Sequence, residues 1–296
     1  MSRGVGELEL AAALPEPIVV LAALLTALGD VWFIFLLLGV LYWFGTTIPG
    51  PLSLSRRHAA FVIALAFGGL ALITALKELL QLPRPPNASE PAGAELIPQT
   101  VLPIYAELGA ASGFGFPSGH AVAAVVVYGG LAVLIGTRRG YVMAIVLCAV
   151  IPLSRIALGV HYLVDIVVGV AVGIAYLAVT VRLCGQGSNP GRAMMIALAV
   201  ALLGAAIGYT SDTMFALGGA LGMRMGWGIV GGAVVHESVT RRGGAIATGF
   251  GLVFAVLFGA VYAFDVAPHV GFLGMFVVVW GVLAAPLAGE AIARRL

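Results

Sequence analysis

Residues 154–165 read SRIALGVHYLVD and place a serine, an arginine, a histidine and an aspartate in an otherwise apolar stretch. His161 and Asp165 are four residues apart, so on a helix they would share one face, one turn from each other. A carboxylate in that place can hold one imidazole nitrogen while the other points at a substrate. Ser154 and Arg155 lie upstream of a glycine, at which a bend could bring them to the same centre. Because charged groups in hydrocarbon are costly, these residues are candidates for function.

The composition is that of an integral membrane protein. Of the 296 residues, 61% are hydrophobic and 9% are charged, whereas a soluble domain carries about 25% charged residues. The net charge is +2 and no basic face is apparent, so nucleic acid is not expected as a partner. Cys148 and Cys184 lie in or beside apolar stretches, and no disulfide framework is predicted.

Apolar runs predict the membrane spans, because about 18 or more such residues are enough to cross a bilayer. We expect an interfacial helix over Pro17–Leu28 and then about nine spans. A polar, proline-rich loop over Gln81–Pro117 separates the second span from the third. The fold class is therefore all-α, a polytopic membrane helical bundle. The predicted spans are Val31–Phe44, His58–Leu80, Ser118–Gly136, Tyr141–Leu153, a segment from about His161 to Val181, Ala193–Tyr209, Phe215–Val235, Ala245–Phe264 and Val270–Ala291.

Charged residues alternate between the two sides of these spans. Cytoplasmic loops carry an arginine excess, so we expect the N-terminus outside, the C-terminus in the cytoplasm and the first cluster of polar residues at the extracytoplasmic face. The arginines that follow odd-numbered spans are Arg56, Arg57, Arg138, Arg139, Arg182, Arg192, Arg241, Arg242, Arg294 and Arg295. The acids in loops after even-numbered spans are Glu90, Glu95, Glu107, Asp212 and Asp265.

Two further motifs fall on the same predicted face. Lys77 precedes Arg84 by seven residues, about two helical turns, so both cations could face one point, although Pro83 must end the helix before Arg84. Residues 117–120 read PSGH and open the third span, where backbone N–H groups and the positive end of a helix predict an anion site. The three clusters together predict a pocket for a phosphoryl group, with a nucleophile and a second histidine.

The ordered motifs resemble the type 2 phosphatidic acid phosphatase superfamily. Its pattern, K-x6-R-P, then P-S-G-H, then S-R-x5-H-x3-D, is matched at every specified position over about residues 57–181. The resemblance implies that His161 is a nucleophile that forms a phosphohistidine, that Asp165 orients it, and that His120 is the general acid. It also implies catalysis without a metal or other cofactor, and the sequence shows no ligand spacing typical of a metal site. The implied phosphate ligands are Lys77, Arg84, Ser118, Gly119 and Arg155, with Ser154 in a supporting position.

The chain is expected to divide into three parts. Residues 1–56 hold the interfacial helix and first span, residues 57–184 the phosphatase-like core, and residues 185–296 a C-terminal transmembrane extension. The family core has about six helices, so the extension is additional. Its glycine-rich helices predict close packing and a possible homo-oligomer; a role in shaping the lipid entrance is the alternative. Asp30 and Asp212 are expected to cap helix ends, and lining an outer vestibule is the other possibility.

The resemblance implies an integral membrane phosphatase that hydrolyses a lipid phosphate monoester or an isoprenyl diphosphate at the extracytoplasmic face, surrounded by membrane lipids. A lipid phosphotransferase that uses the same phosphohistidine is an open alternative. A transporter of anions or lipids is a more distant one, because the charges gather at one face and the motifs do not repeat. Phosphatidic acid, a prenyl or dolichyl diphosphate, phosphatidylglycerophosphate and a sugar phosphate all stay open as substrates.

Overall fold

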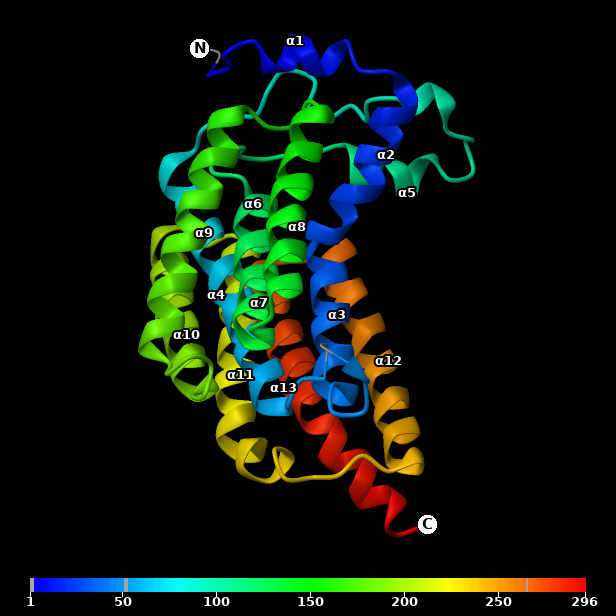
Figure 1. The fold of residues 1–296 in the computed structure, drawn as a ribbon, viewed down its shortest axis with the longest axis vertical. Helices are drawn as coiled ribbons and strands as arrows, with labels where there is room; N and C mark the ends of the chain where they lie inside the picture. Colours follow the sequence, from blue (N-terminus) through cyan, green and yellow to red (C-terminus); the bar gives the residue numbers. More distant parts are fainter. Residues whose placement is uncertain (1–2, 51–52, 265) are drawn as a thin grey trace.

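The chain forms a bundle of helices in a computed structural model, which describes residues 3–50, 53–264 and 266–296 (Figure 1). Within these ranges there is no strand, which confirms the all-α prediction. The α-helices are α1 (Glu7–Ala12), α2 (Glu16–Thr26), α3 (Val31–Phe44), α4 (Arg56–Leu80), α5 (Leu102–Gly109), α6 (Gly119–Ala124), α7 (Gly130–Ile135), α8 (Arg138–Ala157), α9 (Leu163–Leu183), α10 (Pro190–Ile207), α11 (Ser211–Val234), α12 (Arg241–Ala263) and α13 (Pro268–Ala293). Short turns η1 (Ala27–Gly29), η3 (Ala94–Leu96) and the π-helical η4 (Val125–Gly129) join them.

Helix α4 is the central helix of the bundle. It is almost entirely apolar between its charged ends, and such a helix is stable only when other elements surround it. Helices α3, α6, α10 and α11 pack around it (Figure 1). It ends at Leu80, because Gln81 adopts a left-handed conformation with φ of 50° and Pro83 follows. Lys77 therefore lies on the last helical turn, and Arg84 lies in the loop beyond it.

Six helices in the described ranges are long and apolar enough to cross a membrane: α4, α8, α9, α10, α12 and α13. Helices α2 and α3 meet this criterion only together, as a pair bent by 49°, and the helix over Gly119–Ile135 is shorter. Helix α11, where the seventh span was expected, is not among the six, because its glycines and Arg224 lower its mean hydropathy. A multi-pass helical bundle is confirmed. The count of about nine spans and the interfacial placement of Pro17–Leu28 stay predictions.

The glycines of α11 are used for packing inside the chain. A Cβ added at Gly218 or Gly222 would collide with the backbone of Phe272 or Phe276 on α13, and one at Gly226 would approach Trp280. Small residues four apart thus let α11 and α13 lie close together. These three glycines are consequently not available to an interface between two copies, and oligomerisation stays a prediction.

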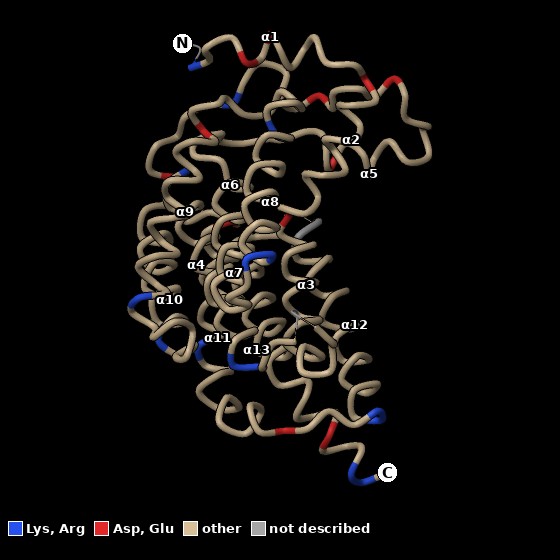
Figure 2. Tube along the Cα trace, viewed as in Figure 1, with Lys and Arg blue, Asp and Glu red and all other residues tan. Residues whose placement is uncertain are grey.

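Acidic residues are unevenly distributed along the bundle. Figure 2 shows them concentrated at the end that carries α1 and α5, where some basic residues also lie, while other basic residues lie from the middle of the bundle to the opposite end, near the C-terminus. At that opposite end Arg294 pairs with Glu237 at 2.9 Å, and Arg56 donates to the backbone carbonyl of Val234 at 3.0 Å. Asp265, one of the loop acids named above, lies outside the described residues.

Candidate active site

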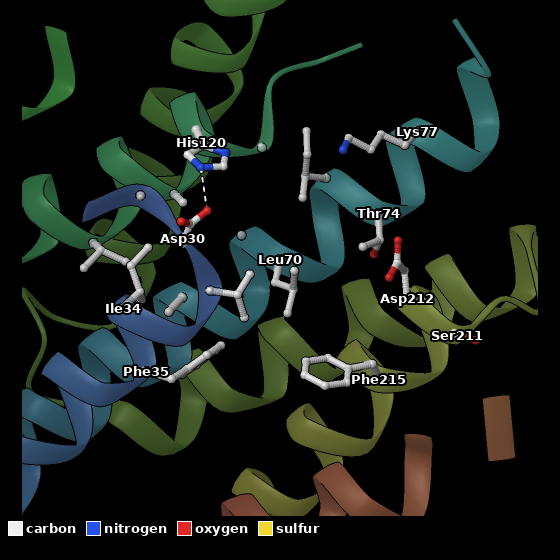
Figure 3. Close-up of a pocket in the computed structure, with 18 of the residues that line it drawn as sticks. Asp30, Ile34, Phe35, Leu70, Thr74, Lys77, His120, Ser211, Asp212 and Phe215 are labelled. Carbon is white, nitrogen blue, oxygen red and sulfur yellow. Dashed lines mark hydrogen bonds and ion pairs between the residues drawn. The ribbon is translucent and has the colours of Figure 1, made fainter. Parts of the chain in front are cut away.

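The three sequence clusters meet at one cavity of about 460 Å³. They come from the end of α4, the start of α6 and the connection between α8 and α9, segments that are far apart in the chain. Figure 3 shows Lys77 and His120 on opposite sides of the cavity. The predicted site residues that line it are Lys77, Arg84, Gly119, His120, Arg155 and His161.

His161 lies just before α9, which begins at Leu163. The expectation that His161 and Asp165 share a helical face is therefore wrong, although the contact between them exists. Asp165 Oδ2 lies 3.2 Å from His161 Nδ1 and also accepts the backbone N–H of Tyr162 at 3.0 Å. The carboxylate thus fixes both the imidazole and the first turn of α9. Upstream, Gly159 makes the expected bend with φ of 69°, a conformation that favours glycine.

Arg84 holds the other nitrogen of this imidazole. Its Nη1 lies 3.0 Å from His161 Nε2 and donates to the carbonyl of Val160 at 3.1 Å, while its Nε donates to the carbonyl of Ser112 at 2.8 Å. Burial lowers the pKa of Arg84 to about 10. Burial, and next the positive charge of Arg84, hold the pKa of His161 well below its ordinary value. The imidazole is therefore neutral, with a lone pair on Nε2 that faces the cationic group.

Arg155 reaches the cavity from the last turn of α8. That helix continues to Ala157, beyond the predicted end of the fourth span at Leu153. Arg155 Nη1 donates to Thr26 Oγ1 at 3.2 Å and to the carbonyl of Leu108 at 3.0 Å. The side chain is buried, so these bonds fix a guanidinium that could meet a phosphate.

Neither serine of the motifs lines the cavity. Ser154 donates its hydroxyl to the carbonyl of Ile151 at 2.6 Å, within its own helix. Ser118 is buried; its backbone N–H donates to the carbonyl of Asp165 at 3.0 Å, and its hydroxyl has no partner in the described part of the chain. Ser118 thereby ties the start of α6 to α9, and a direct contact of either serine with phosphate stays a prediction.

His120 is bonded to a residue that the motifs did not include. Its Nε2 lies 2.9 Å from Oδ1 of Asp30 (Figure 3). Asp30 occupies the N-cap position of α3, yet its side chain makes no capping hydrogen bond. The expected capping role is thus wrong for Asp30, and the vestibule alternative holds, since Asp30 and Asp212 both line the cavity. The available signal was the pair Gly29-Asp30, which interrupts a long apolar run.

The N-terminal segment covers the side of the site that carries His161 and Asp165. Arg3 Nη1 forms an ion pair of 3.0 Å with Asp165 Oδ1, and its guanidinium lies over the ring of Tyr162 at 5.1 Å from the centroid. Glu7 Oε1 accepts the backbone N–H of Leu163 at 3.0 Å, the first residue of α9. These contacts were not expected, because nothing in the sequence links Arg3 or Glu7 to a motif so far downstream.

Many other residues of the cavity are apolar, although Thr74, Ser211 and Asp212 also line it. Helices α3 and α4 contribute Ile34, Phe35 and Leu70, and the C-terminal extension contributes Phe215 of α11 and Val261 of α12. Figure 3 shows the two phenylalanines at one end of the cavity, with Lys77 and His120 toward the other. The extension therefore forms part of the cavity wall as well as a packing layer. The described residues contain no group of three or more His, Cys, Asp or Glu side chains that could hold a metal ion.

The similarity to known proteins covers the part of the chain that carries the motifs. Residues 57–186 match the PAP2 superfamily. Over 133 residues the chain is 31% identical to decaprenylphosphoryl-5-phosphoribose phosphatase from each of two strains of Mycobacterium tuberculosis, which covers 44% of this chain and 65% of the relative. The chain thus spans slightly less than two thirds of the length of these relatives. No solved structure matches significantly. All three motif clusters lie inside the matched segment, so the similarity to the PAP2 superfamily includes the candidate site.

Proposed function

We propose that this protein is an integral membrane phosphatase that hydrolyses a phosphate monoester or diphosphate carried by a lipid, through a phosphohistidine intermediate. One observation carries the proposal: a single cavity is lined by two histidines and three cations and also by many apolar side chains. The polar side chains suit a phosphoryl group and the apolar side chains suit the chain attached to it. The similarity to named phosphatases supports the same reaction.

The proposed reaction is an in-line displacement at phosphorus. His161 Nε2 attacks the phosphorus atom while Asp165 holds Nδ1–H and stabilises the positive charge that develops on the ring. The bond between phosphorus and the leaving oxygen breaks, and His120 gives that oxygen its proton. Water then attacks the phosphohistidine, gives a proton back to His120 and releases inorganic phosphate. Lys77, Arg84 and Arg155 neutralise the charge on the equatorial oxygens.

The relatives suggest a substrate class. Their name states a phosphate on a sugar that is linked to a prenyl phosphate, so we propose a prenyl-linked sugar phosphate as the first candidate. Phosphatidic acid, prenyl diphosphates and phosphatidylglycerophosphate are the next candidate substrates. A prenyl chain would lie against Phe35, Leu70 and Phe215 in the cavity.

We also propose that the site opens to the extracytoplasmic side, with the C-terminus in the cytoplasm. The arginines near the C-terminal end of the bundle support this orientation (Figure 2), because cytoplasmic loops are enriched in arginine and lysine. To test it, a cysteine is introduced beside Arg294 and sealed right-side-out vesicles are treated with a membrane-impermeant thiol reagent. Labelling of this cysteine would place the C-terminus outside and contradict the orientation.

The decisive experiment measures inorganic phosphate release from a panel of these lipids in detergent with a chelator present. We expect release from at least one lipid without an added acceptor, and an acid-labile phosphohistidine trapped at His161. Phosphate that appears only in a second lipid would favour the phosphotransferase alternative. Phosphate release from none of the lipids, with no trapped intermediate, would refute the proposal.

A further inference from the structure

The contact between His120 and Asp30 joins the matched PAP2 segment to a part of the chain outside it. The two residues are 90 positions apart, and Oδ1 of Asp30 lies 2.9 Å from Nε2 of His120. The second carboxylate oxygen, Oδ2, is buried and has no hydrogen-bond partner in the described part of the chain. His120 is therefore the partner that stabilises this carboxylate, since a half-buried charge needs at least one strong donor.

Asp30 follows the short turn η1 between α2 and α3, and we call this segment the corner. Two more contacts hold the corner against the core. Tyr128 donates its hydroxyl to the carbonyl of Leu28 at 2.6 Å, and Arg155 Nη1 donates to Thr26 Oγ1 at 3.2 Å. These bonds come from η4 and α8, so the short turn between α2 and α3 is fixed from several sides. Its position is consequently fixed in part by the core.

Gly29 makes this close approach possible. A Cβ at Gly29 would lie 2.8 Å from Cδ2 of His120 and 2.6 Å from Cγ2 of Ile151, and real Cβ atoms do not approach so closely. The pair Gly29-Asp30 thus combines a residue without a side chain, which lets the backbone reach the imidazole, with a carboxylate that bonds to it.

The surroundings of His120 give a nearby carboxylate a chemical role. A general acid must carry a proton before the leaving group departs, yet Lys77 and Arg155 line the same cavity and disfavour a further positive charge. A carboxylate at hydrogen-bond distance favours the protonated ring. Because Asp30 occupies Nε2, the nitrogen left for the substrate is Nδ1, and in Figure 3 this nitrogen lies on the side of the ring toward Lys77.

We propose that Asp30 is the positioning residue of the general acid: it holds the His120 ring by Nε2, favours its protonated form over the neutral one and presents Nδ1–H to the leaving oxygen. This inference rests on the proposed phosphatase function, and it extends the catalytic machinery beyond the matched PAP2 segment to the corner between α2 and α3.

The test is the dependence of rate on the leaving group in the Asp30→Asn variant. Two substrates with the same apolar chain are compared, one an alkyl phosphate and one a nitrophenyl phosphate. The alkoxide leaving group needs a proton and the nitrophenolate does not. We expect kcat/KM of the variant to fall about 10–100-fold for the alkyl phosphate, the range found when carboxylates that orient histidines are lost, and by less than about 3-fold for the nitrophenyl phosphate.

A purely structural role would give a different pattern. Equal losses on both substrates, or a lower melting temperature with unchanged leaving-group selectivity, would overturn the inference. Glu237→Gln, which removes a carboxylate paired with Arg294 at the opposite end of the bundle, is the matched control and should leave the ratio of the two rates unchanged. If the wild-type protein hydrolyses neither these two substrates nor any lipid of the panel above, the proposed function itself fails, a result distinct from equal losses in the variant.

Discussion

The molecule contains two aspartate–histidine pairs that are built in different ways. His161 and Asp165 are four residues apart and meet through the start of α9, whereas His120 and Asp30 are 90 residues apart and meet only because the corner between α2 and α3 packs on the core. The first pair can be predicted from the short segment of sequence that contains both residues. The second is a product of tertiary structure, and spacing along the chain contains no trace of it.

The pairs also differ in exposure. The side chains of His161 and Asp165 are 2% and 0% exposed, while those of His120 and Asp30 are 19% and 18% exposed. A nucleophile benefits from a dry, fixed environment, because hydration of its lone pair opposes attack. A general acid must meet a leaving group and then regain its proton from water. The buried pair thus suits bond formation to phosphorus, and the open pair suits proton transfer.

The largest effect should come from His161, the proposed nucleophile, in the buried pair. His161→Ala removes the group that would form the covalent intermediate, so we expect phosphate release to fall by roughly 10³-fold or more and the phosphohistidine to disappear. Single-turnover trapping with a radiolabelled lipid phosphate measures both. Retention of wild-type turnover by this variant would exclude the assignment of His161.

The next largest effect should come from Arg84→Gln, which removes the cation beside His161 Nε2. We expect kcat/KM to fall about 10²-fold, as for loss of one oxyanion ligand. The pKa of His161, now depressed by burial and then by Arg84, should rise toward its ordinary value. A protonated ring cannot attack, so the acid limb of the pH profile should move to higher pH.

The substrate also ionises, but its ionisation is the same with the wild type and with Arg84→Gln. A difference between the acid limbs of the two pH profiles therefore reports on the protein. Lys77, Arg155, His120 and Asp165 also face the His161 ring and are unchanged in the variant. An acid limb at the same pH in Arg84→Gln and the wild type would show that Arg84 does not control the protonation of the nucleophile.

A smaller effect should follow from Gly29→Ala, which tests the open pair sterically. The added Cβ would displace the His120 ring or the corner itself, at a cost of about 1–3 kcal/mol for overpacking. We expect roughly 10-fold slower hydrolysis of the alkyl phosphate. Gly39→Ala on α3 is the matched control: nothing lies within 4 Å of its added Cβ, so stability should be unchanged or rise by about 0.5–1 kcal/mol.

If Gly29→Ala and Gly39→Ala show the same activity and melting temperature, the close approach of the corner to His120 is not needed in solution. The measurement pairs a thermal melt in detergent with initial rates on the two matched substrates described above.

The smallest effect should come from Arg3→Gln, which removes the ion pair to Asp165 of the buried pair. Arg3 is partly exposed, with 20% of its side chain accessible, and ion pairs of this kind contribute about 0–1 kcal/mol. We expect at most a roughly 5-fold fall in kcat/KM and no change in leaving-group selectivity. A loss comparable to that of His161→Ala would mean that the N-terminal segment is essential to the nucleophile.

The sequence predicted the parts of the site that depend on local chemistry. Lys77 and Arg84 on either side of a helix end, the helix start at Gly119 and the bend at Gly159 are all where hydropathy, proline and glycine placed them. The helical bundle was equally predictable, because long apolar runs have few other stable forms in a membrane. The starting point of α9 was missed, since the side chain of Asp165 bonds the backbone of Tyr162 and lets the helix begin after His161.

The long-range contributions could not be predicted. Asp30 resembled a helix cap, Arg3 belonged to no motif, and Phe215 and Val261 belonged to an extension with no motif. Each acquires its role only when α2–α3, the N-terminus or α11–α12 packs beside the core. The polarity of such residues can be read from the sequence, but their contact partners on distant helices cannot.

The turn between α2 and α3 has a practical consequence for anyone who trims this chain. A fragment limited to residues 57–186 would keep every motif, yet Arg155, Tyr128 and His120 would lose the partners they find at Thr26, Leu28 and Asp30. A buried polar group left without a partner costs about 1–3 kcal/mol. The boundary drawn by family resemblance is therefore not the boundary of an autonomous unit, and expression designs should begin upstream of α2.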